Sequence, residues 1–357
     1  MRFSSLARAR LPLVLLAALA GGSALAQPPA AETEASEPYV RPDVAKHLEA
    51  FYARPIPTLT REMLVMIHNL PREQAGGFAS LDLPVGEMAV AKDLEMPGPG
   101  GAMRLQLFDP KPDREPGSVV VFYHGGGYVL GSIETHAGLA AEIARRLDLP
   151  VVSVDYRLAP EHPFPAAIED GEAAARWIAE NGAALGREVT GLVLAGDSAG
   201  GNLALVTAAT LRDAPAAVPV VMQIPIYPAT DFTSATPSMV EFAKGYGLDS
   251  EGTEKMVEFY AADPTDLRAS PLLGDLAGLP PTVLVTASLD PMRDQGRAYG
   301  AKLIESGVPT LFYEGEGLVH GFATFRKSIP SAAKDTAEFL DLAKAMLEAS
   351  GSGATTD

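Results

Sequence analysis

The fold of this chain is decided by the sequence LVLAGDSAGGNLALVT at residues 192–207. Four apolar residues suited to a buried strand precede Gly196, and an apolar helical pattern begins at Leu203. A Gly-x-Ser-x-Gly sequence between a strand and a helix forms a sharp turn that holds the serine hydroxyl clear of the sheet. Gly196 and Gly200 are required there because side chains would clash with the neighbouring strand and helix. Ser198 is therefore the candidate nucleophile.

The rest of the chain alternates between short apolar runs rich in β-branched residues and helical patterns. Such alternation predicts an α/β fold, with a mostly parallel sheet and helices on both of its faces. Buried strands are predicted at residues 118–123, 149–155, 191–195, 218–226, 281–287 and 310–314, with edge-side strands at 87–94 and 103–108. Helices are predicted at residues 133–147, 166–182, 199–212, 291–306 and 330–348.

Two segments do not fit the alternation. Residues 39–72 contain two helical patterns, at 44–52 and 60–68, and residues 232–264 contain two more. We expect these segments to form a helical cap over the carboxyl edge of the strands, where open α/β sheets place their sites. The alternative is that they are additions to surface loops. The catalytic domain proper is predicted to span residues 73–348.

Composition narrows the class of protein. The 357 residues are 47% hydrophobic and 20% charged, which is enough apolar material for a large core. Acidic residues outnumber basic ones by 45 to 28, and the resulting charge of −17 repels phosphate backbones, so we expect no nucleic-acid partner. The chain has no cysteine, which excludes disulfides, thiolate metal sites and a cysteine nucleophile. No apolar run reaches the roughly 18 residues that span a bilayer, so we expect no integral membrane association.

The amino-terminal end has the pattern of a secretory signal peptide. Three arginines precede an apolar run at residues 11–20, and small residues at the spacing of a cleavage site end at Ala26. We therefore expect residues 1–26 to be removed and the mature chain to be periplasmic or secreted. An uncleaved membrane anchor is the alternative. Residues 27–38 and 349–357, rich in small and polar residues, are predicted to be loose tails.

A glycine-rich sequence offers backbone donors for a reacting carbonyl. The sequence HGGGY at residues 124–128 directly follows a predicted strand. The N–H groups of Gly125 and Gly126, together with that of Ala199 after the nucleophile, are predicted to form an oxyanion hole. A flexible surface loop is the alternative interpretation. His124 itself is interpreted as a structural residue whose ring bonds to the local backbone.

A serine hydroxyl needs a base to take its proton and a carboxylate to orient that base. Asp290 directly follows one predicted strand, and His320 follows the next strand along the chain. The order Ser198, Asp290, His320 is the order of the triad in α/β-hydrolases. Asp294 is a competing acid, but it lies within the following helix, so Asp290 is predicted. This chemistry requires no metal and no cofactor.

Four aromatic residues are candidates for the walls of an acyl or alcohol pocket: Tyr128, Tyr227, Phe242 and Phe322. Ordinary packing between the cap and the sheet is the alternative interpretation of all four. The partner that these expectations describe is a small-molecule ester substrate.

Together, these motifs resemble those of the hormone-sensitive-lipase-like family of bacterial esterases, in the branch with the sequence Gly-Asp-Ser-Ala-Gly-Gly. Besides the nucleophile motif and the glycines at 124–127, the chain contains a long family signature as YRLAPEHPFPAA at 156–167. The family's Asp-Pro-Leu-x-Asp segment is present as DPMRD at 290–294, where Met292 replaces the leucine with little change in volume. The resemblance covers about residues 39–348.

This resemblance implies an α/β-hydrolase fold with an eight-stranded, mostly parallel sheet flanked by helices and a helical cap. It also implies a serine carboxylesterase that hydrolyses short- to medium-chain acyl esters through a Ser-His-Asp triad and an acyl-enzyme intermediate. Relatives often form homodimers, so a homodimer is a further expectation. Hydrolysis of lactones, carbamates or amides by the same triad remains open. A ligand-binding member of the fold that has lost catalysis is another alternative, which the presence of His320 disfavours.

Overall fold

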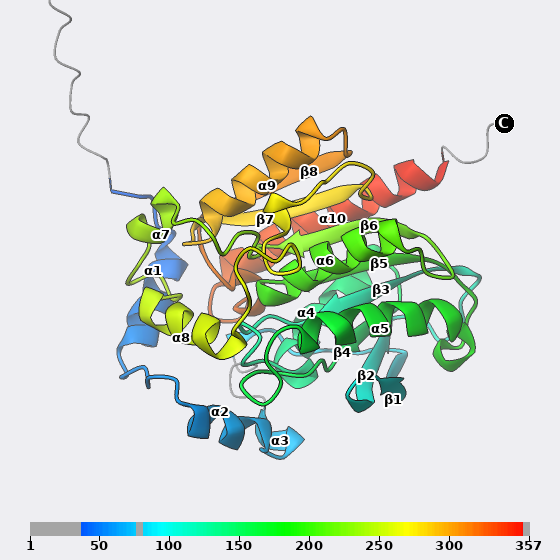
Figure 1. The fold of residues 1–357 in the computed structure, drawn as a ribbon, viewed down its shortest axis with the longest axis horizontal. Coiled ribbons are helices and arrows are strands. Elements are labelled where there is room, and N and C mark those ends of the chain that lie inside the picture. Colours follow the sequence, from blue (N-terminus) through cyan, green and yellow to red (C-terminus); the bar gives the residue numbers. More distant parts are fainter. Residues whose placement is uncertain (1–36, 76–80, 353–357) are drawn as a thin grey trace, which may run out of the picture. The chain divides into compact units, whose positions relative to one another are not determined.

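The computed structural model describes residues 37–75 and 81–352, so the signal peptide expected at 1–26 and most of both predicted tails lie outside the described residues. Eight strands within the described part form one sheet: β1 (Val90–Gly98), β2 (Gly101–Asp109), β3 (Gly117–Tyr123), β4 (Val151–Val154), β5 (Val189–Asp197), β6 (Val220–Ile226), β7 (Thr282–Leu289) and β8 (Thr310–Val319). Their order in the sheet is β1-β2-β4-β3-β5-β6-β7-β8 (Figure 1). β2 is antiparallel to β1 and β4, and all other neighbours are parallel, which confirms the predicted architecture.

The helices of the described residues are α1 (Pro42–Tyr52), α2 (Arg61–His68), α3 (Arg72–Ala75), α4 (Ile133–Leu147), α5 (Ala166–Glu180), α6 (Ala199–Asp213), α7 (Pro237–Glu241), α8 (Ser250–Tyr260), α9 (Arg293–Glu305) and α10 (Pro330–Ser352). Short 3₁₀ turns lie at Gly182–Leu185, Pro271–Leu273 and Phe322–Thr324. Over residues 37–75 and 81–352, no helix combines the length and the apolar character that crossing a bilayer requires.

Helices cover both faces of the sheet (Figure 1). Val119 and Val121 of β3 belong to the same hydrophobic core as residues of α5, α6 and α9. Val120 and Phe122, which point to the opposite face, belong to the core formed with α4 and α10. Because both faces are buried, the central strands are apolar at nearly every position and do not alternate with polar residues.

Several elements extend beyond their predicted ends. β8 continues to Val319, although glycines at 315 and 317 weaken the strand pattern after residue 314. The extension is stabilised by β7, whose Leu289 pairs with Val319. α10 continues to Ser352, so the first residues of the tail predicted at 349–357 are helical. The extension of β8 places the residue that follows it directly at the carboxyl edge of the sheet.

The segments expected to form a cap contain α1, α2, α7 and α8. The hydroxyl of Tyr52, at the end of α1, donates to Asp249 Oδ1 before α8 over 2.6 Å. The ring of His68, at the end of α2, has one nitrogen 2.8 Å from Val129 O and the other 3.0 Å from Glu161 Oε1. α1 therefore joins the α8 segment (Figure 1), and α2 is attached to the chain that follows β3.

A buried ion pair joins the segment before β1 to the chain after β8. Arg326 Nε lies 2.7 Å from Asp82 Oδ1, and Arg326 Nη2 lies 2.7 Å from Asp82 Oδ2. The two side chains are only 1% and 2% exposed. Gly138 of α4 lies alongside, where a Cβ would overlap the carbonyl oxygen of Leu83. The pair therefore fixes the chain after β8 against α4.

Asp82→Ala leaves the Arg326 cation buried without its main partner, so we expect the free energy of unfolding to fall by about 3–5 kcal/mol. The matched control is the exposed pair of Arg146 and Asp341, whose charged atoms are 3.3 Å apart and whose side chains are 40% and 59% exposed. Asp341→Ala should change the same quantity by about 0.5 kcal/mol or less. Urea denaturation of the three proteins measures both effects, and equal small losses would contradict this interpretation.

His124, the residue after β3, is buried in the core. Its ring stacks on Tyr156 with the centroids 4.2 Å apart, and its Nδ1 lies 2.8 Å from the carbonyl oxygen of Gly125. Because a carbonyl oxygen can only accept, Nδ1 carries the hydrogen of a neutral ring. Burial, reinforced by the neighbouring His136, lowers the pKa of His124 to about 3. The folded chain therefore holds this ring neutral at neutral pH.

The unfolded chain binds a proton at His124 near the ordinary pKa of 6.5, whereas the folded chain does so only near pH 3. The stability associated with this neutral ring is complete above pH 6.5 and is lost as the pH falls toward 3, by about 1.4 kcal/mol per pH unit. His124→Asn, which keeps a donor near the Nδ1 position, should show a correspondingly flatter dependence. Urea titrations between about pH 4 and 7 measure this slope. Identical slopes for the two proteins would contradict a buried neutral ring.

Candidate active site

Ser198 occupies a strained turn between β5 and α6. Its backbone has φ 54° and ψ −119°, a conformation that residues with a side chain rarely adopt. The packing leaves no alternative, because a Cβ on Gly200 would overlap the carbonyl oxygen of Tyr123 at the end of β3. The N–H of Ser198 also donates to Ile226 O at the end of β6, over 2.8 Å. Both strands that flank β5 therefore hold the turn, and Ser198 stands at the carboxyl edge of the sheet.

His320 and Asp290 meet Ser198 at this edge. His320 Nε2 lies 2.8 Å from Ser198 Oγ, and His320 Nδ1 lies 2.7 Å from Asp290 Oδ2. Asp290 is fully buried, and its other oxygen accepts the N–H of Met292 over 2.8 Å. Because the carboxylate faces Nδ1, that nitrogen carries the hydrogen, and the lone pair of Nε2 faces the serine hydroxyl. This arrangement can remove the proton of Ser198 and stabilise the imidazolium that results.

Asp294, the competing acid, points elsewhere. Its Oδ2 accepts the N–H of Ser238 on α7 over 2.8 Å, and its Oδ1 lies 2.8 Å from Arg293 Nε. Burial alone would raise the pKa of Asp294, but Arg293 and the Ser238 N–H together lower it below its ordinary value. Asp294 therefore connects α9 to α7, and the structure brings Asp290, not Asp294, to the histidine.

The glycines that follow β3 lie beside Ser198, but the prediction that the Gly125 N–H is one of the oxyanion donors is wrong. The N–H of Gly125 donates to Asp197 Oδ1 over 2.9 Å, so it is not available to a substrate oxygen. Over residues 37–75 and 81–352, the N–H groups of Gly126, Gly127 and Ala199 donate to no other group. Gly126 and Gly127 have φ values of 119° and 63°, which glycine adopts without strain. The available donors are therefore Gly126 and Ala199, as predicted, with Gly127 in place of Gly125.

Two of the four predicted pocket residues lie next to the reacting groups. The ring of Tyr227 has its centroid 4.8 Å from that of His320, and Tyr128 directly follows the glycine loop. Phe322 instead packs behind Tyr227, with the centroids 5.4 Å apart, and is fully buried in the core with α10. Phe242 belongs to the same core and lies under the Arg293 guanidinium. Phe242 and Phe322 thus show the ordinary packing that was the alternative interpretation.

Two residues of α8 next to the loop were not identified from the sequence. A Cβ on Gly127 would overlap the side chain of Met256, so α8 lies directly on the glycine loop. Tyr260 stacks on Tyr128, with the centroids 3.7 Å apart and the rings nearly parallel at 5°. The helical pattern of residues 250–260 indicates a cap helix but carries no signal for the surface that it covers.

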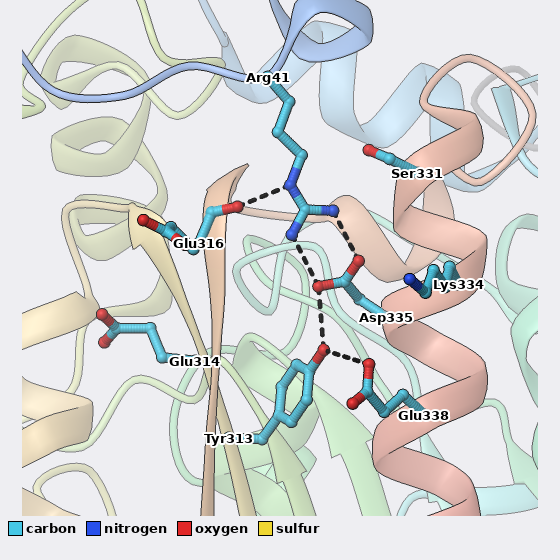
Figure 2. A pocket seen from close by; sticks show the side chains of 8 residues that line it. All are labelled: Arg41, Tyr313, Glu314, Glu316, Ser331, Lys334, Asp335 and Glu338. Atoms are coloured by element: carbon cyan, nitrogen blue, oxygen red, sulfur yellow. Dashed lines mark hydrogen bonds and ion pairs between the residues drawn. The ribbon is translucent and has the colours of Figure 1, made fainter.

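A pocket of about 440 Å³ lies away from the triad, between β8 and α10 (Figure 2). Its central charged side chains, Arg41 and Asp335, already pair with one another, and Tyr313 donates to the same carboxylate. No group of three or more His, Asp or Glu side chains in the described part of the chain is arranged to hold a metal ion.

The sequence matches known proteins over most of its length. A family model for the alpha/beta hydrolase fold matches residues 120–324. Esterase LipI of Mycobacterium tuberculosis is 40% identical over 252 residues, which are 68% of this chain and 78% of the relative. The arylesterase of Saccharolobus solfataricus is 35% identical over 286 residues, which are 79% of this chain and 91% of the relative.

Solved structures agree with the fold. The ester hydrolase EH1AB1 from the metagenome of Lake Arreo, solved with a derivative of bipyridine phosphonate, is 35% identical. It superposes with a TM-score of 0.78 over 87% of this chain and 100% of its own. EstE1, a thermostable carboxylesterase from a metagenomic library, is 37% identical with a TM-score of 0.71, covering 81% of this chain and 97% of its own. The chain belongs to the hormone-sensitive-lipase-like family of α/β-hydrolases.

Proposed function

We propose that the chain is a carboxylesterase that uses Ser198 as its nucleophile. The observation that carries this proposal is the continuous chain of hydrogen bonds from Ser198 Oγ through His320 to Asp290, at 2.8 and 2.7 Å. A serine bonded in this way to a neutral histidine is prepared for attack on an acyl carbon. The relatives LipI, EstE1 and the arylesterase are all named as esterases, which supports the same reaction class.

The reaction follows from the positions of these groups. Ser198 Oγ attacks the ester carbonyl carbon while its proton passes to His320 Nε2. The negative charge that develops on the carbonyl oxygen is met by the free N–H groups of Gly126, Gly127 and Ala199. When this intermediate collapses, the alcohol leaves with the proton from Nε2, and an acyl ester of Ser198 remains. His320 then deprotonates water, which attacks the acyl carbon, and the carboxylic acid and free serine are released.

We propose that the substrates are esters of short- to medium-chain acids. The cap supports this limit, because Met256 lies against Gly127 and the Tyr128–Tyr260 pair is almost fully buried beside the same loop. Side chains that close over the oxyanion donors leave little room for a long, unbent chain. The thioether of Met256 and the rings of Tyr128 and Tyr260 are apolar, which suits an acyl group better than a charged one.

With p-nitrophenyl esters from acetate to palmitate, we expect the wild type to cleave the short esters fastest, and Ser198→Ala to lower kcat roughly 10⁴- to 10⁶-fold. Ser153→Ala is the matched control, because Ser153 is a buried serine of β4 whose hydroxyl has no partner among the described residues. Its activity should equal that of the wild type. A folded wild type that cleaves none of these esters would overturn the proposed function, and cleavage of lactones or amides alone would replace its substrate class.

Asp290→Asn and Asp294→Asn distinguish the two candidate acids. Asp290→Asn removes the charge that stabilises the His320 imidazolium and favours the wrong tautomer, so we expect kcat to fall by about 10⁴-fold. Asp294→Asn weakens the contacts with Ser238 of α7 and with Arg293, and it should change kcat by less than about threefold, since Asp294 touches no reacting group. Steady-state kinetics with one short ester measures both. Comparable losses in the two variants would contradict the assignment of Asp290.

A further inference from the structure

A second aspartate and histidine lie close together on the other side of the nucleophile. Asp197, the last residue of β5, is 3% exposed, and His136, in the first turn of α4, is 8% exposed. His136 Nε2 lies 3.4 Å from Asp197 Oδ1, and the N–H of Gly125 donates to the same oxygen over 2.9 Å. Neither side chain takes part in the reaction described above. The N–H of Gly125 also donates to His136 Nε2, over 3.3 Å. Side chains from β5 and α4 thus meet at one backbone N–H.

The hydrogen bonds of His136 indicate what its ring donates. Its Nδ1 lies 2.7 Å from the hydroxyl oxygen of Thr135, and that hydroxyl donates to the carbonyl of Ser132 over 2.9 Å. With its hydrogen used in this way, the hydroxyl can only accept from Nδ1–H. Nε2 lies 3.4 Å from Asp197 Oδ1, and the N–H of Gly125 donates to Nε2 over 3.3 Å. With its hydrogen on Nδ1 and a lone pair on Nε2, the ring can bind both the Thr135 hydroxyl and the Gly125 N–H.

Asp197 is a buried carboxylate that the fold holds ionised. Burial alone would raise its pKa, but His136 and the N–H of Gly125 lower the pKa of Asp197 below its ordinary value. A buried charge of this kind is costly unless a cation and hydrogen-bond donors surround it. The N–H of Gly125 supplies a donor, and the His136 ring lies 3.4 Å from the same oxygen.

Gly125 is held at both its backbone N–H and its backbone C=O. Asp197 holds the Gly125 N–H, and His124 Nδ1 donates to the Gly125 carbonyl oxygen over 2.8 Å. Because the C=O and N–H of one planar peptide point in opposite directions, holding the Gly125 oxygen sets the direction of the Gly126 N–H. Glycine is required at 125, since a Cβ there would overlap the Asp197 carboxylate. Asp197 is also the direct neighbour of Ser198, so its side chain ties the nucleophile to the oxyanion donors.

We propose that His136 and Asp197 form a positioning pair, which binds the Gly125 N–H from two sides and so holds the glycine loop in register with Ser198. Neither residue touches the substrate; both act through Gly125. The inference rests on the proposed ester hydrolysis, because the pair matters only when negative charge forms at Gly126 and Ala199. Displacement of a reacting group by about 1 Å can cost roughly 100-fold in rate.

The test begins with His136→Ala. This variant removes one of the two side chains that bind the Gly125 N–H and leaves the Asp197 carboxylate without its histidine partner, so we expect kcat for a short p-nitrophenyl ester to fall about 10- to 100-fold while KM changes by less than about threefold. Affinity for a trifluoromethyl ketone, which forms a tetrahedral adduct with the serine, should fall by the same factor as kcat.

Adding Asp197→Asn to His136→Ala removes the unpaired charge but keeps an oxygen that can accept the Gly125 N–H. We expect the double variant to recover at least about fivefold in kcat over His136→Ala alone, a coupling that loss of stability does not predict. Thr282→Val is the control, because it breaks a buried 2.8 Å hydrogen bond to Gln223 away from the site. It should lower the melting temperature and leave kcat unchanged.

Phosphonylation of Ser198 by a p-nitrophenyl phosphonate separates the failure of this inference from that of the proposed function. We expect His136→Ala to slow it about as much as ester hydrolysis, because the same donors stabilise both transition states. If the wild type reacts and His136→Ala reacts equally fast, with only a lower melting temperature, the pair is structural and the inference is wrong. A folded wild type that is inert to both the esters and the phosphonate overturns the proposed function, and the inference with it.

Discussion

The turn at Ser198 depends on the close approach of backbone from three neighbouring strands. The Cα of Gly200 lies against the carbonyl oxygen of Tyr123, and the N–H of Ser198 is bonded to Ile226. A positive φ at a serine costs about 1–3 kcal/mol, and it persists only because the surrounding sheet and α6 allow no other path for the chain. Tyr123 immediately precedes the glycine loop. The contact that creates the strained turn therefore also brings the oxyanion donors next to the nucleophile.

The parallel direction of β3, β5, β7 and β8 gathers the remaining groups at the same edge. Each of these strands ends directly before a functional segment: at Tyr123, Asp197, Leu289 and Val319. Side chains that follow a paired strand without an intervening loop have little freedom, which keeps the distances from Ser198 to His320 and Asp290 short. Such preorganisation lowers the barrier because no large reorientation accompanies the reaction. The continuation of β8 to Val319 is part of this arrangement.

Buried carboxylates flank Ser198 on two sides, and each has a different histidine and a different backbone N–H as its partners. Asp290 is paired with His320 and with the N–H of Met292, whereas Asp197 is paired with His136 and the N–H of Gly125. The space next to the glycine loop is determined by the cap helices and not by the sheet. α8 covers the glycines, and α1 is bonded to the segment that leads into α8. The sheet thus supplies the chemistry, and the helices added to it limit access.

The reacting side chains could be predicted because each depends on a local pattern. Ser198 lies between an apolar strand and an apolar helix, and Asp290 and His320 each follow an apolar run, so their place at the carboxyl edge follows from the α/β alternation alone. The ends of the strands and helices were less predictable. β8 is longer than its apolar run because its pairing with β7 compensates for its glycines.

The sequence by itself determined that Ser198, Asp290 and His320 each follow a strand and so share the carboxyl edge of the sheet. The tertiary structure decided which backbone N–H groups remain free, since Gly125 donates to a carboxylate from another strand and Gly127 does not. It also decided that Phe322 packs in the core and that Met256 of α8 covers the loop. A repeating pattern shows which residues of an element are apolar, but the partner of a given N–H or ring is set by contacts between segments far apart in the chain.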